Sequence, residues 1–250
     1  MKREFNPDVP ELMDRPQPVS PELEADLLNL VSLNRHFGSH RLVRRFLSRW
    51  LVPGEVYRVL DLATGAGDIP RVIADWARAR GATVRIDAVD ANPSTLEIAR
   101  KHAADYPEID FIHGDVLAYE TRQSYDLVCC SLALHHFGEA DAVKLLRTCS
   151  ELSNRFVLVA DLERSLAALA SIYALTALIY RDPMTQFDGR TSARRAFSFA
   201  EFRALAEAAG WKDFGHARYL FCRQALWLDR RELGDIPDVV ALDELPCPAA

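Results

Sequence analysis

One short segment constrains the fold more than any other part of the chain. Residues 57–62 form an apolar, partly β-branched run typical of a buried strand, and Gly65 and Gly67 follow within five residues. Glycine adopts backbone angles closed to other residues and lets a ligand lie against bare peptide. Pro70 then suits the first turn of a helix. The segment predicts a strand, a tight binding loop and a helix in succession.

Two classes of ligand fit such a loop. A dinucleotide fingerprint has a third glycine where the helix meets the strand, and Pro70 stands at that position instead. The carboxylate of Asp61, inside the strand end, repels a pyrophosphate but attracts a cationic amino group or a sulfonium. The segment therefore favours S-adenosylmethionine over a dinucleotide.

Short apolar runs alternate with helical periodicity along most of the chain, which predicts a parallel sheet covered by helices on both faces. We expect strands at 57–62, 84–90, 109–113, 125–131 and 155–161, and helices at 70–80, 95–104, 140–152 and 198–209. Gly81 indicates a C-terminal helix cap, Asn92 with Glu97 a capping box, and Ser198 with Glu201 a second capping box.

Two further strand-like runs, 211–219 and 220–227, leave no room for a crossover helix, so they must pair antiparallel. With this hairpin the chain, from about Leu42 to Leu228, resembles the class I S-adenosylmethionine-dependent methyltransferase superfamily. It is most similar to the small-molecule branch with the ubiquinone and menaquinone C-methyltransferases. The resemblance implies a Rossmann-like α/β fold. Its seven-stranded, mostly parallel sheet would end in the antiparallel hairpin, with an N-terminal helical cap and a helical insertion after strand five.

Three segments, 33–38, 161–165 and 188–198, are similar to methyltransferases that accompany type III polyketide synthases. This narrower resemblance implies secondary metabolism. Only four of the 30 basic residues are lysine, and with abundant alanine this composition is typical of a GC-rich bacterial genome.

The superfamily's first motif is an acid followed by three glycines at alternate positions. Asp61, Ala63, Gly65 and Gly67 occupy these positions, and Ala63 departs from the pattern by one methyl group. The resemblance implies that all four belong to the cofactor site.

Three strand ends supply the other expected cofactor contacts. The resemblance implies that Asp90, with Ala91, binds the ribose hydroxyls, that Asp115, with Val116, contacts the adenine, and that Ser131 lies near the methionine portion. Each acid has a structural alternative: Asp90 as a helix N-cap, although Asn92 fits that role better, and Asp115 as a turn aspartate after Gly114.

His135 and His136 follow strand four, on the substrate side of the cofactor in this fold. A phenol or enol oxygen needs a base before it attacks a methyl group, and histidine has a suitable pKa. We take His136 as the first candidate for the base and His135 as the second. The alternative is that both are polar side chains satisfied near the core.

Several absences narrow the chemistry. No Asn/Asp-Pro-Pro-aromatic run of a nucleobase amino-methyltransferase follows strand four, and Cys129 and Cys130 lack the proline of a cytosine C5 enzyme. A metal-dependent catechol type would have an acid after strand four as well as near Asp161, and only the latter is present. We therefore expect no metal site.

Residues 165–180 are uncharged but too short and too interrupted by Ser and Thr to span a membrane. We expect a helical lid over an apolar acceptor, with core packing or a homodimer surface as alternatives. Its expected apolar face is Leu166, Leu169, Ile172, Leu175, Leu178 and Ile179. Arg190, Arg194 and Arg195 are placed in the following loop, either as solvated charges or closing over a polar acceptor head.

Overall composition limits the partners. A net charge of −6 argues against a nucleic-acid substrate. The five cysteines show no C-x-x-C spacing and residues 1–7 lack the apolar core of a signal peptide, so we expect a reduced, cytoplasmic protein. We expect one domain, 1–250, with an extended arm (1–21), a helical cap (22–52), a cofactor-binding core (53–163 and 198–228), a lid (164–197) and a tail (229–250).

These features together predict O-methylation of a small, apolar, hydroxylated acceptor such as an alkylated phenol or pyrone, with S-adenosylhomocysteine as the by-product. C-methylation of a quinone-like ring is the first alternative. A regulatory module that binds S-adenosylmethionine without turnover is the second.

Overall fold

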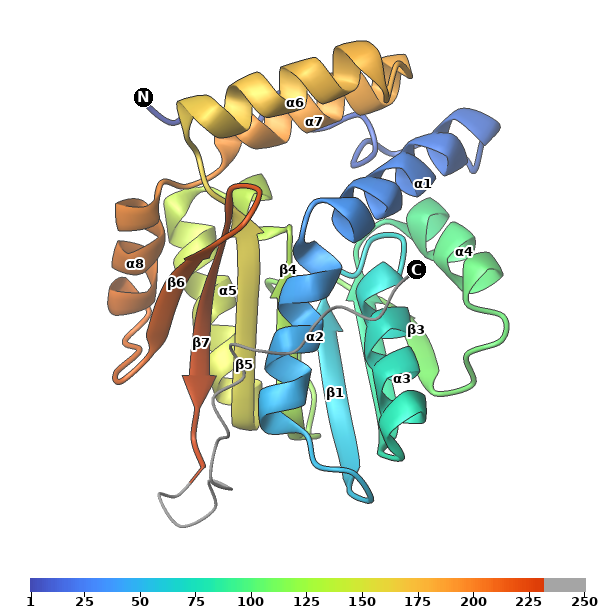
Figure 1. Ribbon diagram of the computed structural model, residues 1–250, viewed down its shortest axis with the longest axis vertical. Coiled ribbons are helices and arrows are strands. Elements are labelled where there is room, and N and C mark those ends of the chain that lie inside the picture. Colours follow the sequence, from blue (N-terminus) through green and yellow to red (C-terminus); the bar gives the residue numbers. More distant parts are fainter. Residues whose placement is uncertain (232–250) are drawn as a thin grey trace.

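A seven-stranded sheet runs through the middle of the molecule in the order β3-β2-β1-β4-β5-β7-β6. The computed structural model describes residues 1–231 and shows helices on both faces of this sheet (Figure 1). The strands are β1 (Val56–Leu62), β2 (Thr83–Asp90), β3 (Ile109–His113), β4 (Tyr125–Ser131), β5 (Ser153–Leu162), β6 (Gly215–Tyr219) and β7 (Arg223–Asp229). The helices are α1 (Pro21–His36), α2 (Ser39–Trp50), α3 (Asp68–Arg80), α4 (Pro93–His102), α5 (Glu139–Leu152), α6 (Leu166–Leu178), α7 (Pro183–Arg195) and α8 (Phe199–Ala208), with the 3₁₀ turn η1 (Leu134–His136).

The strand directions confirm the predicted fold class. Strands β1 to β5 are parallel to one another, whereas β7 runs antiparallel to both β5 and β6. The hairpin begins later than predicted, because residues 211–214 form a loop in which Trp211 is buried and its indole N–H donates to the carbonyl of Leu146. The predicted tail starts one residue too early, because Asp229 still belongs to β7, and residues 232–250, with Cys247, lie outside the part of the chain that the structure describes.

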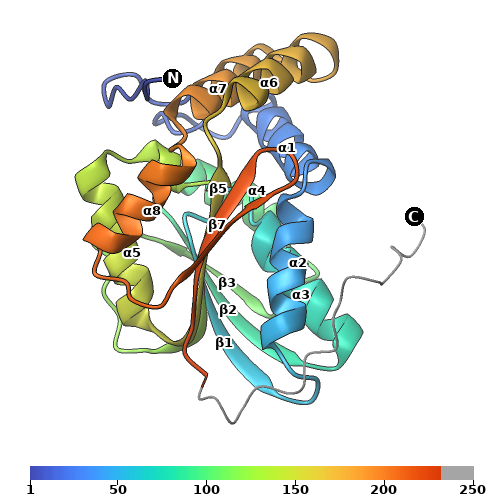
Figure 2. The ribbon, with the colours of Figure 1, turned by 60° about the vertical axis from the view of Figure 1, so that its left-hand side comes forward.

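Alternate residues of each central strand enter two separate cores. On β5, Phe156 and Leu158 pack with helices α2 and α3, whereas Val157 and Val159 pack with α5 and α8. Figure 2 shows these two helix pairs on opposite sides of the sheet. A parallel strand buried on both faces needs apolar residues at nearly every position, which is why these strands read as continuous hydrophobic runs.

Most of the predicted helix ends are confirmed. Gly81 caps α3 in a left-handed conformation, and Ser198 with Glu201 forms the expected capping box of α8. The side chain of Asn92 accepts the backbone N–H groups of the first turn of α4. The predicted role of Glu97 in that cap is wrong, because it lies beyond the third helical position, where a reciprocal hydrogen bond must originate.

The insertion after β5 differs from the prediction. It is two helices, α6 and α7, which pack on each other above the carboxyl ends of the parallel strands (Figure 1). Arg190, Arg194 and Arg195 therefore lie on a helix, and their placement in a loop is wrong. Asp182 begins α7 by accepting two backbone N–H groups, so the Asp-Pro pair at 182–183 was the available signal.

The N-terminal arm has no regular secondary structure and is held against α7 by hydrogen bonds. The guanidinium of Arg195 donates to the carbonyl of Asn6, and the carboxylate of Asp188 accepts the N–H groups of Leu12 and Met13. The arm thus passes beside the insertion helices and brings its acidic residues toward the sheet. Within residues 1–231, no helix has both the length and the apolar character needed to cross a bilayer.

Candidate active site

A cavity of about 980 Å³ opens at the carboxyl edge of the parallel strands, where open α/β sheets bind ligands. Its walls come from the loop after β1, the ends of β2 and β4, η1, helices α1, α6 and α7, and the N-terminal arm. A volume of this order suits one or two small molecules rather than a polymer.

The loop after β1 exposes peptide to this cavity. Ala63, Gly65 and Gly67 all have positive φ angles, of 57°, 54° and 67°. A Cβ added at Gly65 would meet nothing, so bare backbone faces open space, whereas a Cβ at Gly67 would lie 2.8 Å from the Phe111 ring. Gly65 is therefore open to a ligand, and Gly67 is required by packing. Ala63 holds a left-handed conformation that costs an alanine about 1–2 kcal/mol, at the position where the superfamily motif has glycine.

The carboxylate of Asp90 connects the end of β2 to this loop. One oxygen accepts the N–H of Gly65 at 2.8 Å, and the other accepts the N–H of Asn92 at 2.9 Å. Burial raises the pKa of Asp90, and these two backbone hydrogen bonds oppose that rise. Each oxygen keeps a further acceptor site, and the side chain lines the cavity.

Two of the predicted cofactor residues do not reach the cavity. Asp61 is 1% exposed beneath the loop, and burial, reinforced by the nearby carboxylates of Asp68 and Asp90, raises the pKa of Asp61 to about 8. Gly67 packs against Phe111 instead. The structure does bring the other predicted cofactor residues to the cavity wall: Ala63, Gly65, Asp90, Ala91, Asp115, Val116 and Ser131.

The polar side chains at the ends of β3 and β4 differ in whether they have hydrogen-bond partners in the protein. One carboxylate oxygen of Asp115 accepts the N–H of Leu117, so Asp115 stabilises a turn while its side chain also lines the cavity. The hydroxyl of Ser131 is buried and has no hydrogen-bond partner in the described part of the chain. Such atoms at a cavity wall are sites for ligand hydrogen bonds.

Both predicted histidines line the cavity, and each is oriented by a carboxylate. The Nδ1 atom of His135 lies 2.7 Å from Asp161, and the Nδ1 atom of His136 lies 2.7 Å from Asp14. Burial lowers the pKa of His135 despite the attraction of Asp161. Burial opposes the charged form of His136 too, but the carboxylates of Asp14 and Glu11 outweigh it and raise the pKa of His136.

Sequence reasoning missed the acids of the arm. Glu11 is 2% exposed, accepts a hydrogen bond from the hydroxyl of Ser192 at 2.9 Å, and faces both histidines. Burial raises the pKa of Glu11 to about 8. No motif marks Glu11 or Asp14, because they lie in an irregular, proline-rich segment more than 100 residues from their partners.

A second missed group lies at the start of α3. The carboxylate of Asp68 lines the cavity, accepts the side-chain N–H of Asn34 at 3.1 Å, and lies 2.7 Å from Nε2 of His40. Asp68 directly follows Gly67, so its place next to the glycine motif was the available signal.

The lid contributes fewer apolar residues than predicted. Ile172 and Leu175 line the cavity, and Leu169 is half-buried. The prediction is wrong for Leu166, Leu178 and Ile179, which are 75%, 68% and 64% exposed. Helix α6 is apolar on every side, so sequence periodicity could not indicate which side faces α7 and the cavity.

Comparison with known proteins identifies part of this architecture. A sequence family described as "Methyltransferase domain" matches residues 59–155. The chain is 34% identical over 82 residues to the 2-phytyl-1,4-naphtoquinone methyltransferase of Thermosynechococcus vestitus, a match that covers 33% of this chain and 35% of that protein. It is 30% identical over 132 residues to the demethylmenaquinone methyltransferase of Thermotoga maritima, covering 52% of each. The chain spans about a third of the length of the first curated relatives it matches.

The fold has solved counterparts. The plantazolicin methyltransferase BpumL, in complex with a pentazolic desmethylPZN analog and SAH, superposes with a TM-score of 0.64 at 13% identity, over 85% of this chain and 92% of BpumL. At this level of identity the likeness supports the fold alone, and the sheet order and the closing hairpin agree with it.

Proposed function

Because residues 59–155 match a methyltransferase domain and the sheet has the class I methyltransferase order, we propose that the chain uses S-adenosylmethionine to methylate a small, apolar, hydroxylated acceptor on oxygen. The observation that carries the proposal is the Asp90 carboxylate, tied to the Gly65 amide at the wall of a cavity with a largely apolar lid. When bound, S-adenosylmethionine supplies an electrophilic methyl group on a sulfonium, and the sulfur leaves as a neutral thioether.

The residues present fit this cofactor. The free acceptor sites on the Asp90 oxygens suit the two ribose hydroxyls, and the bare peptide at Gly65 allows close approach of the nucleoside. The unpartnered hydroxyl of Ser131 suits the polar end of the methionine portion. Asp68, on the same wall, suits the positive amino group.

The rest of the cavity suits an apolar acceptor. Leu27 and Leu30 of α1 face it from one side, and Ile172 and Leu175 of α6 from another. An alkylated phenol or pyrone of polyketide type would bury its hydrocarbon against these residues and present its hydroxyl to the polar residues of the cavity wall. The apolar residues on the exposed side of α6 would be buried if two copies of the chain packed together there, which supports a homodimer. Sedimentation velocity tests for this dimer.

The imidazole pair supplies the group that keeps the acceptor oxygen deprotonated. Both rings line the cavity, and both are fixed through Nδ1, so their Nε2 atoms face the Glu11 carboxylate at distances too long for a hydrogen bond. Because the two imidazole rings are already held in position, less translational and rotational entropy is lost when the acceptor oxygen and the ring nitrogens come together.

Methylation of carbon on a quinone-like ring is the second candidate. It is favoured by the similarity to the ubiquinone/menaquinone biosynthesis C-methyltransferase UbiE of Rickettsia felis, 37% identical over 81 residues. Both reactions use the same donor site, so the position of the new methyl group separates them.

The test is transfer of labelled methyl from S-adenosylmethionine to a panel of alkylresorcinols, alkylpyrones and quinols, with product structure determined by NMR. We expect an aryl or enol methyl ether, formed by the wild type and lost in Asp90→Ala. A ring C-methyl product would establish the second candidate. Tight binding of S-adenosylmethionine with no transfer to any acceptor would contradict both and indicate a regulatory module.

A further inference from the structure

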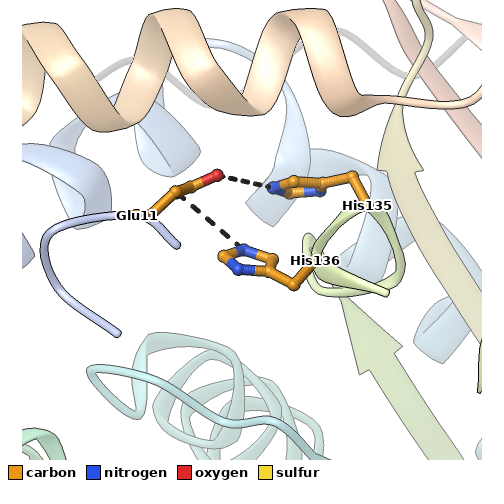
Figure 3. A group of neighbouring side chains, drawn as sticks. All are labelled: Glu11, His135 and His136. Carbon is orange, nitrogen blue, oxygen red and sulfur yellow. Dashed lines mark ion pairs between the residues drawn. The ribbon is translucent and has the colours of Figure 1, made fainter. Parts of the chain in front are cut away.

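Three side chains from two distant segments converge at the acceptor end of the cavity. Glu11 comes from the N-terminal arm, and His135 and His136 come from η1 after β4 (Figure 3). One ligand atom from each residue lies within 4.8 Å of the other two. Glu11 and His135 are each 2% exposed, so the group is enclosed by protein on most sides.

The two imidazole rings present the same atom to Glu11. Because Asp161 and Asp14 hold the Nδ1 atoms, the Nε2 atoms point toward the Glu11 carboxylate, at 3.8 Å for His135 and 3.9 Å for His136. These separations are too long for hydrogen bonds. The Nε2 atom of His135 is buried and has no hydrogen-bond partner within residues 1–231.

This spacing is close to what a shared metal ion requires. Zinc binds imidazole nitrogen and carboxylate oxygen at about 2.0–2.2 Å, which places tetrahedral ligand atoms about 3.4 Å apart. Each Nε2 atom lies about half an ångström farther than this from one Glu11 oxygen, a different oxygen for each ring, and one ligand atom from each of the three residues lies within 4.8 Å of the others. A carboxylate on the far nitrogen of a ligand histidine is the usual orienting contact in metal sites, and both histidines have one.

The ligand set also indicates which kind of metal would bind. Magnesium and calcium prefer sites built from oxygen alone, whereas two imidazoles and one carboxylate suit zinc and the neighbouring first-row ions. Three protein ligands leave a fourth position open, as in catalytic zinc sites. Here that position faces the cavity, because all three ligand residues line it.

We propose that Glu11, His135 and His136 hold a divalent transition-metal ion of the zinc type, whose open position binds the hydroxyl of the acceptor. The expectation of no metal site considered only the residues after strands four and five, and Glu11 of the arm completes the ligand set. Asp14 and Asp161 are then positioning residues that orient the two rings.

The chemical use of the ion rests on the proposed function, whereas its binding does not. The acceptor hydroxyl passes its proton to a metal-bound hydroxide, which leaves as water, and the acceptor oxygen stays on the ion. That oxygen forms its bond to the methyl carbon as the carbon–sulfur bond breaks, and the electron pair of that bond goes to sulfur. The methylated product, now neutral at oxygen, leaves the ion.

The test is titration of the untagged, chelator-stripped protein with Co²⁺, followed by visible absorption, and competition with Zn²⁺. We expect one equivalent to bind with a Kd of about 1 µM or lower. Glu11→Gln and His136→Ala should each weaken binding at least tenfold, about 1.4 kcal/mol. His102→Ala is the matched control, because His102 also contacts a glutamate, Glu24 at 2.8 Å, yet lies outside the cavity.

Circular dichroism and S-adenosylhomocysteine affinity, measured without metal, check that the variants fold, and Glu11→Gln keeps the size of the side chain. The proposal is overturned if the wild type binds no Co²⁺ or Zn²⁺, or if the cavity variants bind as tightly as His102→Ala. Binding of S-adenosylhomocysteine without metal binding removes the metal site and leaves the proposed function standing. Metal binding without binding of S-adenosylhomocysteine would support the metal site and contradict the proposed function.

Discussion

The carboxylate of Asp90 and the amide of Gly65 are joined by a hydrogen bond of 2.8 Å, so the end of β2 fixes the loop that follows β1. The second oxygen of Asp90 holds the N–H of Asn92, where α4 begins. One side chain therefore organises two loops at the cavity wall.

Removal of that carboxylate should weaken the cofactor site. We expect Asp90→Ala to lower the affinity for S-adenosylhomocysteine at least tenfold, about 1.4 kcal/mol, because it deletes the acceptors proposed for the ribose and frees the Gly65 loop. Isothermal titration calorimetry measures the change. Asp105→Ala, at an exposed aspartate after α4, should bind as the wild type does. Equal affinities for both variants would show that Asp90 is not a cofactor ligand.

The two glycines of the loop should respond differently to alanine. Gly67→Ala forces a methyl group into the Phe111 ring, so we expect it to lower the free energy of unfolding by about 1–3 kcal/mol. Gly65→Ala meets open space and should cost only about 1 kcal/mol for its positive φ. Its main effect should be weaker binding of S-adenosylhomocysteine. Urea unfolding and calorimetry together test this contrast, which fails if Gly67→Ala is the milder change in stability.

The lid should control the acceptor rather than the cofactor. Leu175→Trp fills space at the cavity wall, and we expect kcat/KM for an apolar acceptor to fall about tenfold with little change in S-adenosylhomocysteine affinity. Leu178→Trp, on the exposed side of the same helix, is the matched control. Steady-state kinetics on the best acceptor distinguishes them. Equal loss in both variants would place the acceptor elsewhere.

Acid should weaken the ion pair between Arg164, which lies just before α6, and Glu201 of α8. Burial opposes ionisation of Glu201, but hydrogen bonds from Arg164 and Ser198 outweigh it and lower the pKa of Glu201 to about 2. A folded-state pKa below the unfolded value, about 4.3, means that stabilisation is complete above that value and is lost as the pH falls toward 2.

The wild type should therefore be more stable than Glu201→Gln between about pH 5 and 8, and the difference should shrink below about pH 4. Unfolding in urea across this range measures it. Glu207→Gln removes an exposed pair with Arg203 on the same helix, so its difference from the wild type should be small at every pH. A Glu201→Gln difference that grows on acidification would contradict the account.

The parts of the fold that the sequence predicts correctly are those determined by short stretches of neighbouring residues. The strand runs, the glycine loop and the caps at Gly81 and Ser198 each act within a few residues, so their positions are readable without tertiary structure. The same holds for the residues at strand ends, Asp90 and Ser131, because the carboxyl ends of parallel strands meet at one edge.

The sequence alone does not indicate how deeply a residue is buried or which distant residues it contacts. Asp61 lies at a strand end like Asp90, but the loop covers it, and only packing determines that difference. Glu11 reaches the histidines through an irregular arm whose path depends on Arg195 and Asp188 of α7. A uniformly apolar helix such as α6 likewise has no periodicity that orients it.

The most direct measurement of the central claim is a crystal structure grown with S-adenosylhomocysteine. The account predicts the nucleoside in the large cavity, with both ribose hydroxyls on the Asp90 carboxylate and the sugar against the peptide of Gly65. A nucleoside bound at any other place, or a cavity that excludes it at saturating concentration, would contradict the account.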